Sequence, residues 1–227
     1  TGAGFGRDLT AGEMLAQAAL TGAAEGVRVS RIVVMGIGEP FDNYDNLIRF
    51  LHLANDPDGL GIGMRHLTVS TCGRVPEMLK FTNEELQVNL SVSLHAPDDE
   101  TRIRLMPIAR KYPIDELMAA CRTYTEQTGR RITFEYSLFS GINDSPGHAK
   151  RLCGLLKGLL CHVNLIPANE FDGGLFTKSS RATVRSFQDI LESCRIPVTV
   201  RRELGTDIMA ACGQLRRGLE NERDNAD

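Results

Sequence analysis

The sequence predicts an α/β fold built around a parallel β-sheet, and two observations carry that prediction. Short apolar runs such as Ile32-Val33-Val34-Met35 alternate along the whole chain with stretches whose apolar residues recur at helical spacing. Continuous apolar runs are typical of parallel strands that are buried on both faces. Strands that alternate with helices indicate βαβ units, and such units form parallel sheets.

Six strands and six helices are expected. The strands are predicted at 32–35, 66–71, 88–94, 131–138, 161–166 and 197–201. The helices are predicted at about 10–24, 43–54, 76–81, from 113 onward, from 146 onward, and at 180–194. The first begins with a capping box formed by Thr10 and Glu13. Because the chain starts with a helix, we expect a preceding strand to be missing. The pattern fits either an open doubly wound sheet or a partial barrel, and ligands bind at the carboxyl ends of the strands in both.

The composition is that of an ordinary globular protein with no overall attraction to nucleic acid. The 227 residues are 42% hydrophobic and 24% charged, and one domain at 1–219 with a polar tail at 220–227 is expected. The formal net charge is −3, so an RNA partner requires a local basic patch or a further module. We find neither an apolar run near the ~18 residues of a membrane span nor a signal peptide, and we expect a cytoplasmic protein without a membrane partner. A monomer is the default expectation.

The cysteines show no local metal-binding spacing. Six are present, at positions 72, 121, 153, 161, 194 and 212, and none forms a CxxC pair or a zinc-finger pattern. In the cytosol they are expected to be reduced. Cys121, Cys153 and Cys194 fall on apolar faces of predicted helices, and we expect them to pack in the core.

Polar or glycine residues follow four of the predicted strands directly. After the first strand, Gly36 and Gly38 let the backbone approach a ligand, and Glu39 can accept hydrogen bonds from an amine or a hydroxyl. The same glycines fit a dinucleotide fingerprint only poorly, because its third glycine is absent and Pro40 interrupts the turn. A plain strand-to-helix turn is the alternative.

The next three strand ends supply hydroxyl, imidazole and amide groups. Ser70 and Thr71 end one strand on opposite faces, so only one can line a given cavity. Ser93 and His95 flank Leu94 on a shared face and can both donate to a carboxylate, although a lone histidine is often structural. Asn169 follows the fifth strand. Such a set suits a small molecule with a carboxylate, an amine and a ribose.

Cys212 follows the last predicted strand between small residues and Gly213. Its open surroundings suit a nucleophile if a neighbouring group favours the thiolate. A passive thiol is the alternative that the spacing alone leaves open.

Five motifs occur in the order of one known family. They are GIGEP at 36–40, STCG at 70–73, SLHAPDDE at 93–100, NLIPAN at 164–169 and DIMAACGQL at 207–215. The chain thereby resembles, from residue 5 to about 217, the radical S-adenosylmethionine (SAM) methyltransferases that methylate C2 of an adenine in 23S rRNA and in tRNA. Close relatives that methylate C8 of the same rRNA adenine share much of the pattern.

The resemblance implies a partial (β/α)6 barrel that binds SAM and a [4Fe–4S] cluster. By position, Gly38 and Glu39 would contact the methionine amine of SAM. Ser70 and the stretch Ser93, Leu94 and His95 would line the rest of its site, and Asn169 would lie near the adenosine. Cys212 matches the cysteine that carries the methyl group as S-methylcysteine.

The chemistry of the family explains why a cysteine is needed. C2 of adenine is electron-poor, so polar methyl transfer to it is impracticable. The family moves a methyl group to the cysteine sulfur by displacement. A second SAM, reductively cleaved at the cluster, gives a 5′-deoxyadenosyl radical that activates this methyl group for addition to C2. A second cysteine then releases the product through a disulfide intermediate. The cofactor supplies the radical step, and the protein positions the reacting groups.

The chain departs from the family at its start. The CxxxCxxC motif that holds the cluster would lie just before Thr1, together with the releasing cysteine and an accessory RNA-binding domain, and none of these is in the sequence. We therefore expect no metal ligand in this chain, and no turnover by it alone. A reductant protein would serve the complete enzyme. The alternatives are an rRNA adenine-C8 methyltransferase and a SAM- or nucleotide-binding module without a cluster.

Overall fold

The computed structural model describes residues 6–35, 38–168 and 176–201. Within them the strands are β1 (Ile32–Val34), β2 (Leu67–Thr71), β3 (Asn89–Ser93), β4 (Ile132–Leu138), β5 (Cys161–Pro167) and β6 (Val198–Val200). The α-helices are α1 (Ala11–Glu25), α2 (Tyr44–Asn55), α3 (Val75–Thr82), α4 (Asp99–Leu105), α5 (Ile114–Thr128), α6 (Pro146–Leu156) and α7 (Arg181–Ser193). Three 3₁₀ turns, at Pro40–Asn43, Met64–His66 and Pro107–Arg110, complete the described elements.

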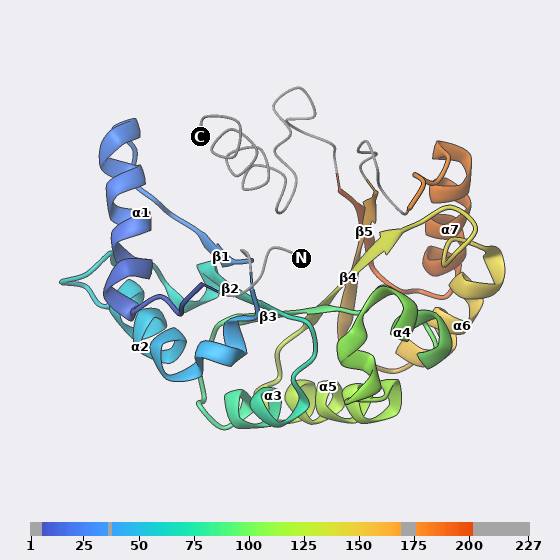
Figure 1. Ribbon diagram of the computed structural model, residues 1–227, viewed down its shortest axis with the longest axis horizontal. Coiled ribbons are helices and arrows are strands. Elements are labelled where there is room, and N and C mark those ends of the chain that lie inside the picture. The colour runs from blue at the N-terminus through green and yellow to red at the C-terminus, as the bar shows by residue number, and fades with distance from the viewer. Residues whose placement is uncertain (1–5, 36–37, 169–175, 202–227) are drawn as a thin grey trace.

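The strand order distinguishes the two architectures that the sequence left open. All six strands are parallel and pair in the order β1-β2-β3-β4-β5-β6. A doubly wound sheet would reverse its order at a switch point. Here the order never reverses, and the sheet curves so that the helices lie around its outer side (Figure 1). Within the described residues the sheet does not close on itself, which confirms the predicted partial barrel.

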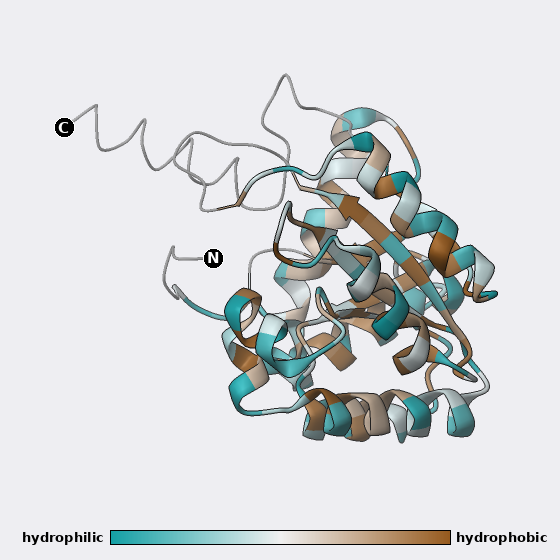
Figure 2. Ribbon diagram, turned by 90° about the vertical axis from the view of Figure 1, so that its right-hand side faces the viewer, coloured by the Kyte–Doolittle hydropathy of each residue, from teal (hydrophilic) through white to brown (hydrophobic). Residues whose placement is uncertain are grey.

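The two faces of the curved sheet differ in chemistry. Outward side chains such as Leu90, Phe134 and Val163 are fully buried against the helices. Inward side chains of β2 to β5 are mostly polar, so polar and apolar residues alternate along most of these strands. Figure 2 shows both kinds of residue on the ribbon of the sheet. An alternating strand has one face in the core and one toward a cavity or solvent. The polar face therefore marks where a ligand site can be built.

Local signals explain the helix boundaries. Helix α1 begins with the predicted capping box, in which the Thr10 hydroxyl accepts from the amide of Glu13 and the Glu13 carboxylate accepts from the amide of Thr10. Helix α1 ends at Gly26 in a left-handed conformation. Helix α6 begins with Ser145 as N-cap and Pro146 in its first turn.

Three details differ from the expectations. Helix α4, capped by Asp98, was not predicted, because its seven residues are too few to show a clear apolar period. Strand β3 ends at Ser93, before Leu94. Cys121 and Cys153 are buried as expected, whereas Cys194 is exposed because it lies at the C-cap of α7, beyond the buried stripe of that helix.

Two further expectations concern the ends of the chain and the membrane. The polar tail predicted at 220–227 lies outside the described residues. Among the helices of the described ranges, none is both long enough and apolar enough to span a bilayer.

Candidate active site

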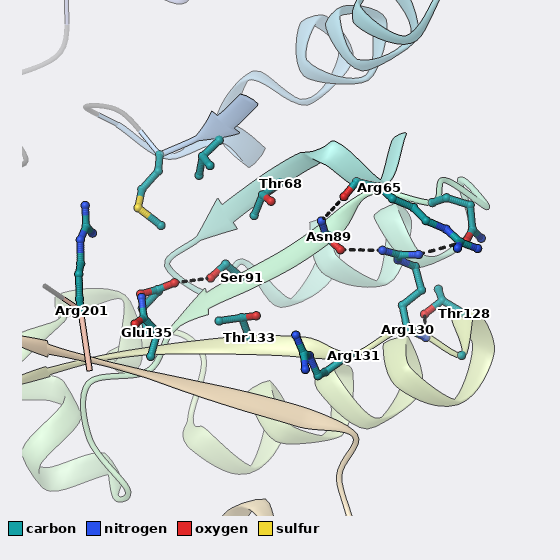
Figure 3. A pocket seen from close by; sticks show the side chains of 15 residues that line it. Arg65, Thr68, Asn89, Ser91, Thr128, Arg130, Arg131, Thr133, Glu135 and Arg201 are labelled. Atoms are coloured by element: carbon teal, nitrogen blue, oxygen red, sulfur yellow. Dashed lines mark hydrogen bonds between the residues drawn. The ribbon is translucent and has the colours of Figure 1, made fainter. Parts of the chain in front are cut away.

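The inner face of the sheet lines a large open cavity of about 1110 Å³ (Figure 3). Pockets for a single drug-sized ligand usually measure about 300–1,000 Å³, so this space can hold more than one small group. Strands β2 to β5 contribute its polar lining, namely Thr68, Asn89, Ser91, Thr133, Glu135 and Asn164. Arginines 65, 130 and 131 lie at the amino ends of the strands, and Arg201 lies at the carboxyl end of β6.

Glu135 is a carboxylate held on this face by its neighbours. Its Oε1 accepts from the Ser91 hydroxyl at 2.9 Å, and its Oε2 accepts from the Asn164 side-chain amide at 2.8 Å. The Thr199 hydroxyl donates to Asn164 Oδ1 at 3.3 Å and contacts His162 Nε2 at 2.9 Å. The network crosses four strands and fixes the orientation of the carboxylate. Sequence reasoning missed Glu135, although Thr133, Glu135 and Ser137 already alternate in the sequence.

Gly38 and Glu39 follow β1, as predicted. Gly38 has φ of +105°, a conformation that favours glycine, and a Cβ built there would meet no atom within 4 Å. Glu39 is half-buried and reaches across to the next strand end. Its carboxylate accepts from the amide of Phe41 at 3.2 Å and from the amide of Cys72 at 2.7 Å. The acid therefore ties the end of β1 to the end of β2.

At the end of β2, the structure separates the roles of Ser70 and Thr71. Thr71 is 1% exposed, and its hydroxyl accepts from the amide of Gly73 at 3.1 Å, so it shapes the turn. Ser70 lies on the same face as Thr68, which lines the cavity, because side chains alternate along a strand. Burial and the nearby Glu39 charge raise the pKa of Cys72, so its thiol stays protonated at neutral pH.

At the end of β3 the chain leaves the strand immediately after Ser93. Leu94 is buried in the core, and its amide and carbonyl are bonded to Glu135 and Arg102, so its side chain cannot line a ligand site. His95 has φ of +56°, so the strand alternation that predicted a face shared with Ser93 does not reach it.

The ring of His95 has a defined protonation state. Its Nδ1 accepts from the amide of Ser137 at 2.9 Å. Burial, with a smaller effect from the Arg102 charge, lowers the pKa of His95 to about 4. The imidazole is therefore neutral at pH 7 and carries its proton on Nε2. His95 can donate one hydrogen bond to a ligand without adding charge.

Arg102, from α4, connects the end of β2 to the end of β3. It is fully buried, and its guanidinium donates to the carbonyls of Cys72 at 2.8 Å, Leu94 at 3.2 Å and Ser93 at 3.3 Å. Its Nη1 makes no hydrogen bond within the described ranges. No signal in the sequence marks this role, because an arginine in a short charged helix is usually exposed.

The structure thus brings together the predicted residues at three successive strand ends. Glu39 bonds the main chain of Cys72, and Arg102 bonds both Cys72 and the segment from Ser93. The two remaining predicted residues, Asn169 and Cys212, lie outside the described residues.

The donor set at these strand ends fits SAM and not a metal. The Ser70 and Ser93 hydroxyls make no hydrogen bond to the protein in the described ranges, which leaves them able to bind a ligand. With the Glu39 carboxylate and the neutral His95 donor, they match a molecule with one ammonium, one carboxylate and ribose hydroxyls. No three His, Cys, Asp or Glu side chains of the described part come together as a metal site. These residues supply no ligand set for an iron–sulfur cluster.

A comparison with protein-family models decides the family. Residues 2–152 match the Radical SAM superfamily. The chain belongs to the radical SAM superfamily. Membership implies SAM and a [4Fe–4S] cluster as cofactors.

Curated relatives narrow the similarity within the radical SAM superfamily. Proteins described as "Probable dual-specificity RNA methyltransferase RlmN" are 55% identical over 217 residues in Thermoanaerobacter pseudethanolicus and 52% over 224 residues in Alkaliphilus metalliredigens. The alignments cover 96% and 99% of this chain but 63% and 64% of those proteins. The chain therefore spans just under two thirds of the length of these relatives.

Solved structures agree with the sequence comparison. The structure described as a radical SAM methyltransferase from Sphaerobacter thermophilus is 49% identical, with a TM-score of 0.88 over 93% of this chain and 63% of its own. A domain of pyruvate-formate lyase-activating enzyme from Bacteroides vulgatus has a TM-score of 0.59 at 16% identity over 77% of this chain and 100% of its own. The second likeness concerns the fold alone.

Proposed function

We propose that this chain is the core of a radical SAM methyltransferase that methylates C2 of an adenine in 23S rRNA and in tRNA. The observation that carries the proposal is the similarity of about 55% to dual-specificity RNA methyltransferases, combined with a SAM-compatible donor set at the strand ends. Residues 1–219 would form this core, in a cytoplasmic, monomeric enzyme that depends on a reductant protein.

Each strand-end residue has a distinct role in the proposal. Gly38 and Glu39 bind the methionine amine of SAM, with the Glu39 carboxylate as acceptor. Ser70, Ser93 and the Nε2–H of His95 donate to the remaining polar groups, and Leu94 acts only by holding the main chain in place. Asn169 binds near the adenosine.

Cys212 would carry the methyl group: its sulfur would attack the methyl carbon of bound SAM, and S-adenosylhomocysteine would leave. The bound cofactors supply the radical that activates this methyl group. The protein orients the two reactants. The described residues supply no ligand set for the cluster, so the tests use the full-length protein.

The decisive experiment uses the full-length protein with its cluster reconstituted. Methylation of 23S rRNA and tRNA transcripts is followed by mass spectrometry of the digested nucleosides. We expect 2-methyladenosine from wild type and none above background from Cys212→Ala. Cys194→Ala is the matched control, because Cys194 is an exposed thiol outside the site, and it should keep wild-type activity.

Three results would contradict the proposal. Full activity of Cys212→Ala would show that Cys212 does not carry the methyl group. If 8-methyladenosine were the sole product, the enzyme would be an adenine-C8 methyltransferase. SAM binding without methylation of any RNA would favour the binding module.

A further inference from the structure

The cavity on the inner face adjoins the predicted SAM residues without containing them. None of Gly38, Glu39, Ser70, Ser93 and His95 lines it. It extends instead along the strands toward their amino ends. Since the reacting groups of two substrates must lie next to each other, a second substrate belongs in this adjoining space.

Glu135 is the carboxylate of this cavity. The side chain is 6% exposed, and among the described residues it forms no ion pair with an arginine or a lysine. A buried carboxylate without a cationic partner is costly and is retained only where hydrogen bonds compensate for lost water. Ser91 and Asn164 each bond one of its oxygens. A carboxylate has about four acceptor positions, so two remain for a ligand.

The sheet register places Glu135 beside the SAM residues. It pairs with Ser93 on β3 and with Asn164 on β5. Glu135 thus lines the second-substrate cavity (Figure 3). On the adjacent strand it pairs with a residue expected to bind SAM. A base bound to Glu135 would lie next to the cofactor.

We propose that Glu135 accepts a hydrogen bond from the exocyclic amino group of the target adenine and thereby selects adenine over purine bases that lack this donor. The inference rests on the proposed function. Enzymes that modify a base extrude it from the stack and read its Watson–Crick edge by hydrogen bonds. On that edge adenine presents an amino donor where guanine presents a carbonyl acceptor. An acceptor-only carboxylate bonds the first and repels the second.

The test pairs a change in the protein with a change in the RNA. The full-length holoenzyme methylates two transcripts that differ at one position, with adenine or unsubstituted purine as the target base. Purine lacks the amino group but keeps the C2–H, so the same reaction remains available. We expect wild type to prefer adenine by about 10- to 100-fold in kcat/KM, the range of a specific base contact. In Glu135→Ala this preference should fall to near one.

Two controls separate recognition from folding and from SAM binding. Glu126→Ala removes an exposed carboxylate of α5, outside the cavity, and should keep the wild-type preference. The SAM dissociation constant of Glu135→Ala, measured by equilibrium dialysis, should stay within about twofold of wild type, because the contact is to the target base. If Glu135→Ala does not fold, the isosteric Glu135→Gln replaces it, with a reduced preference expected.

The results that overturn the inference are distinct from those that overturn the function. Equal methylation of both RNAs by wild type, or an unchanged preference in Glu135→Ala, overturns the adenine contact alone. If weaker SAM binding accounts for all of the activity lost in Glu135→Ala, the carboxylate contacts the adenine of SAM instead. That result also overturns the inference. If wild type methylates neither RNA, the proposed function fails and the inference with it.

Discussion

On strand β4, successive side chains meet two different environments. Phe134 and Tyr136 point outward and are fully buried among the helices, whereas Thr133 and Glu135 point inward and line the cavity. Dispersion and burial of apolar area stabilise the outer face. On the inner face, hydrogen bonds hold polar groups in place for a ligand. On this strand, alternate residues therefore serve different purposes: the outward ones stabilise the fold, and the inward ones are available to bind a ligand. Substitutions can test the two roles separately.

The largest expected effect comes from truncating the outer face. Phe134→Ala removes a ring that is 0% exposed, and we expect the free energy of unfolding to fall by about 3–5 kcal/mol. Thr133→Ala, one residue away on the inner face, should cost less than about 1 kcal/mol. Urea unfolding followed by circular dichroism measures both values. Similar losses in the two variants would contradict the division of the strand into two faces.

The next effect concerns Arg102, whose guanidinium holds the main chain at the ends of β2 and β3. Arg102→Met leaves the three carbonyls that it bonds without their donor, at an expected cost of about 2–4 kcal/mol. Arg104→Met on the same helix is the control, because Arg104 is exposed and its loss should change stability by no more than about 0.5 kcal/mol. Thermal unfolding compares the two variants. Equal melting temperatures would refute the bracing role.

A smaller effect is expected from the pH dependence of His95. Its pKa is about 4 in the folded protein and about 6.5 when unfolded. The unfolded chain thus binds more protons between these values, and stability falls as pH decreases from 6.5 to 4. We expect a loss of at most about 2–3 kcal/mol over this window. His95→Asn tolerates the left-handed backbone and should remove this part of the slope. An identical slope in both proteins, measured by denaturant unfolding at pH 7 and pH 4.5, would contradict the assignment.

The smallest effect is expected at two glycines, where replacement by alanine should change the free energy of unfolding in opposite directions. Gly38→Ala should destabilise by about 1–2 kcal/mol, because its φ is positive although no atom blocks the new methyl group. Gly154→Ala in α6 is equally unobstructed and has ordinary helical geometry, so it should stabilise by about 0.5–1 kcal/mol. Differential scanning calorimetry gives both shifts. A stabilising Gly38→Ala would remove the argument that this turn requires glycine.

The sequence predicted the parallel sheet well, because apolar runs and helix caps are local signals. Strand β4 was predicted at 131–138 and observed at Ile132–Leu138. The polar face was missed because the strands were interpreted as buried on both sides, which hides the alternation of Thr133, Glu135 and Ser137. Arg102 escaped because its role depends on carbonyls from two other segments. Contacts of this kind depend on tertiary structure and leave no periodic pattern.

The consecutive strand order has a consequence for how a polymer reaches the cavity. Strands β1 and β6 are the two ends of the sheet and do not pair with each other in the described part. A closed ring of strands would admit only a free molecule or a chain end through its mouth. An open sheet can also admit a segment from the middle of a polymer from the side, while the flanking segments remain outside.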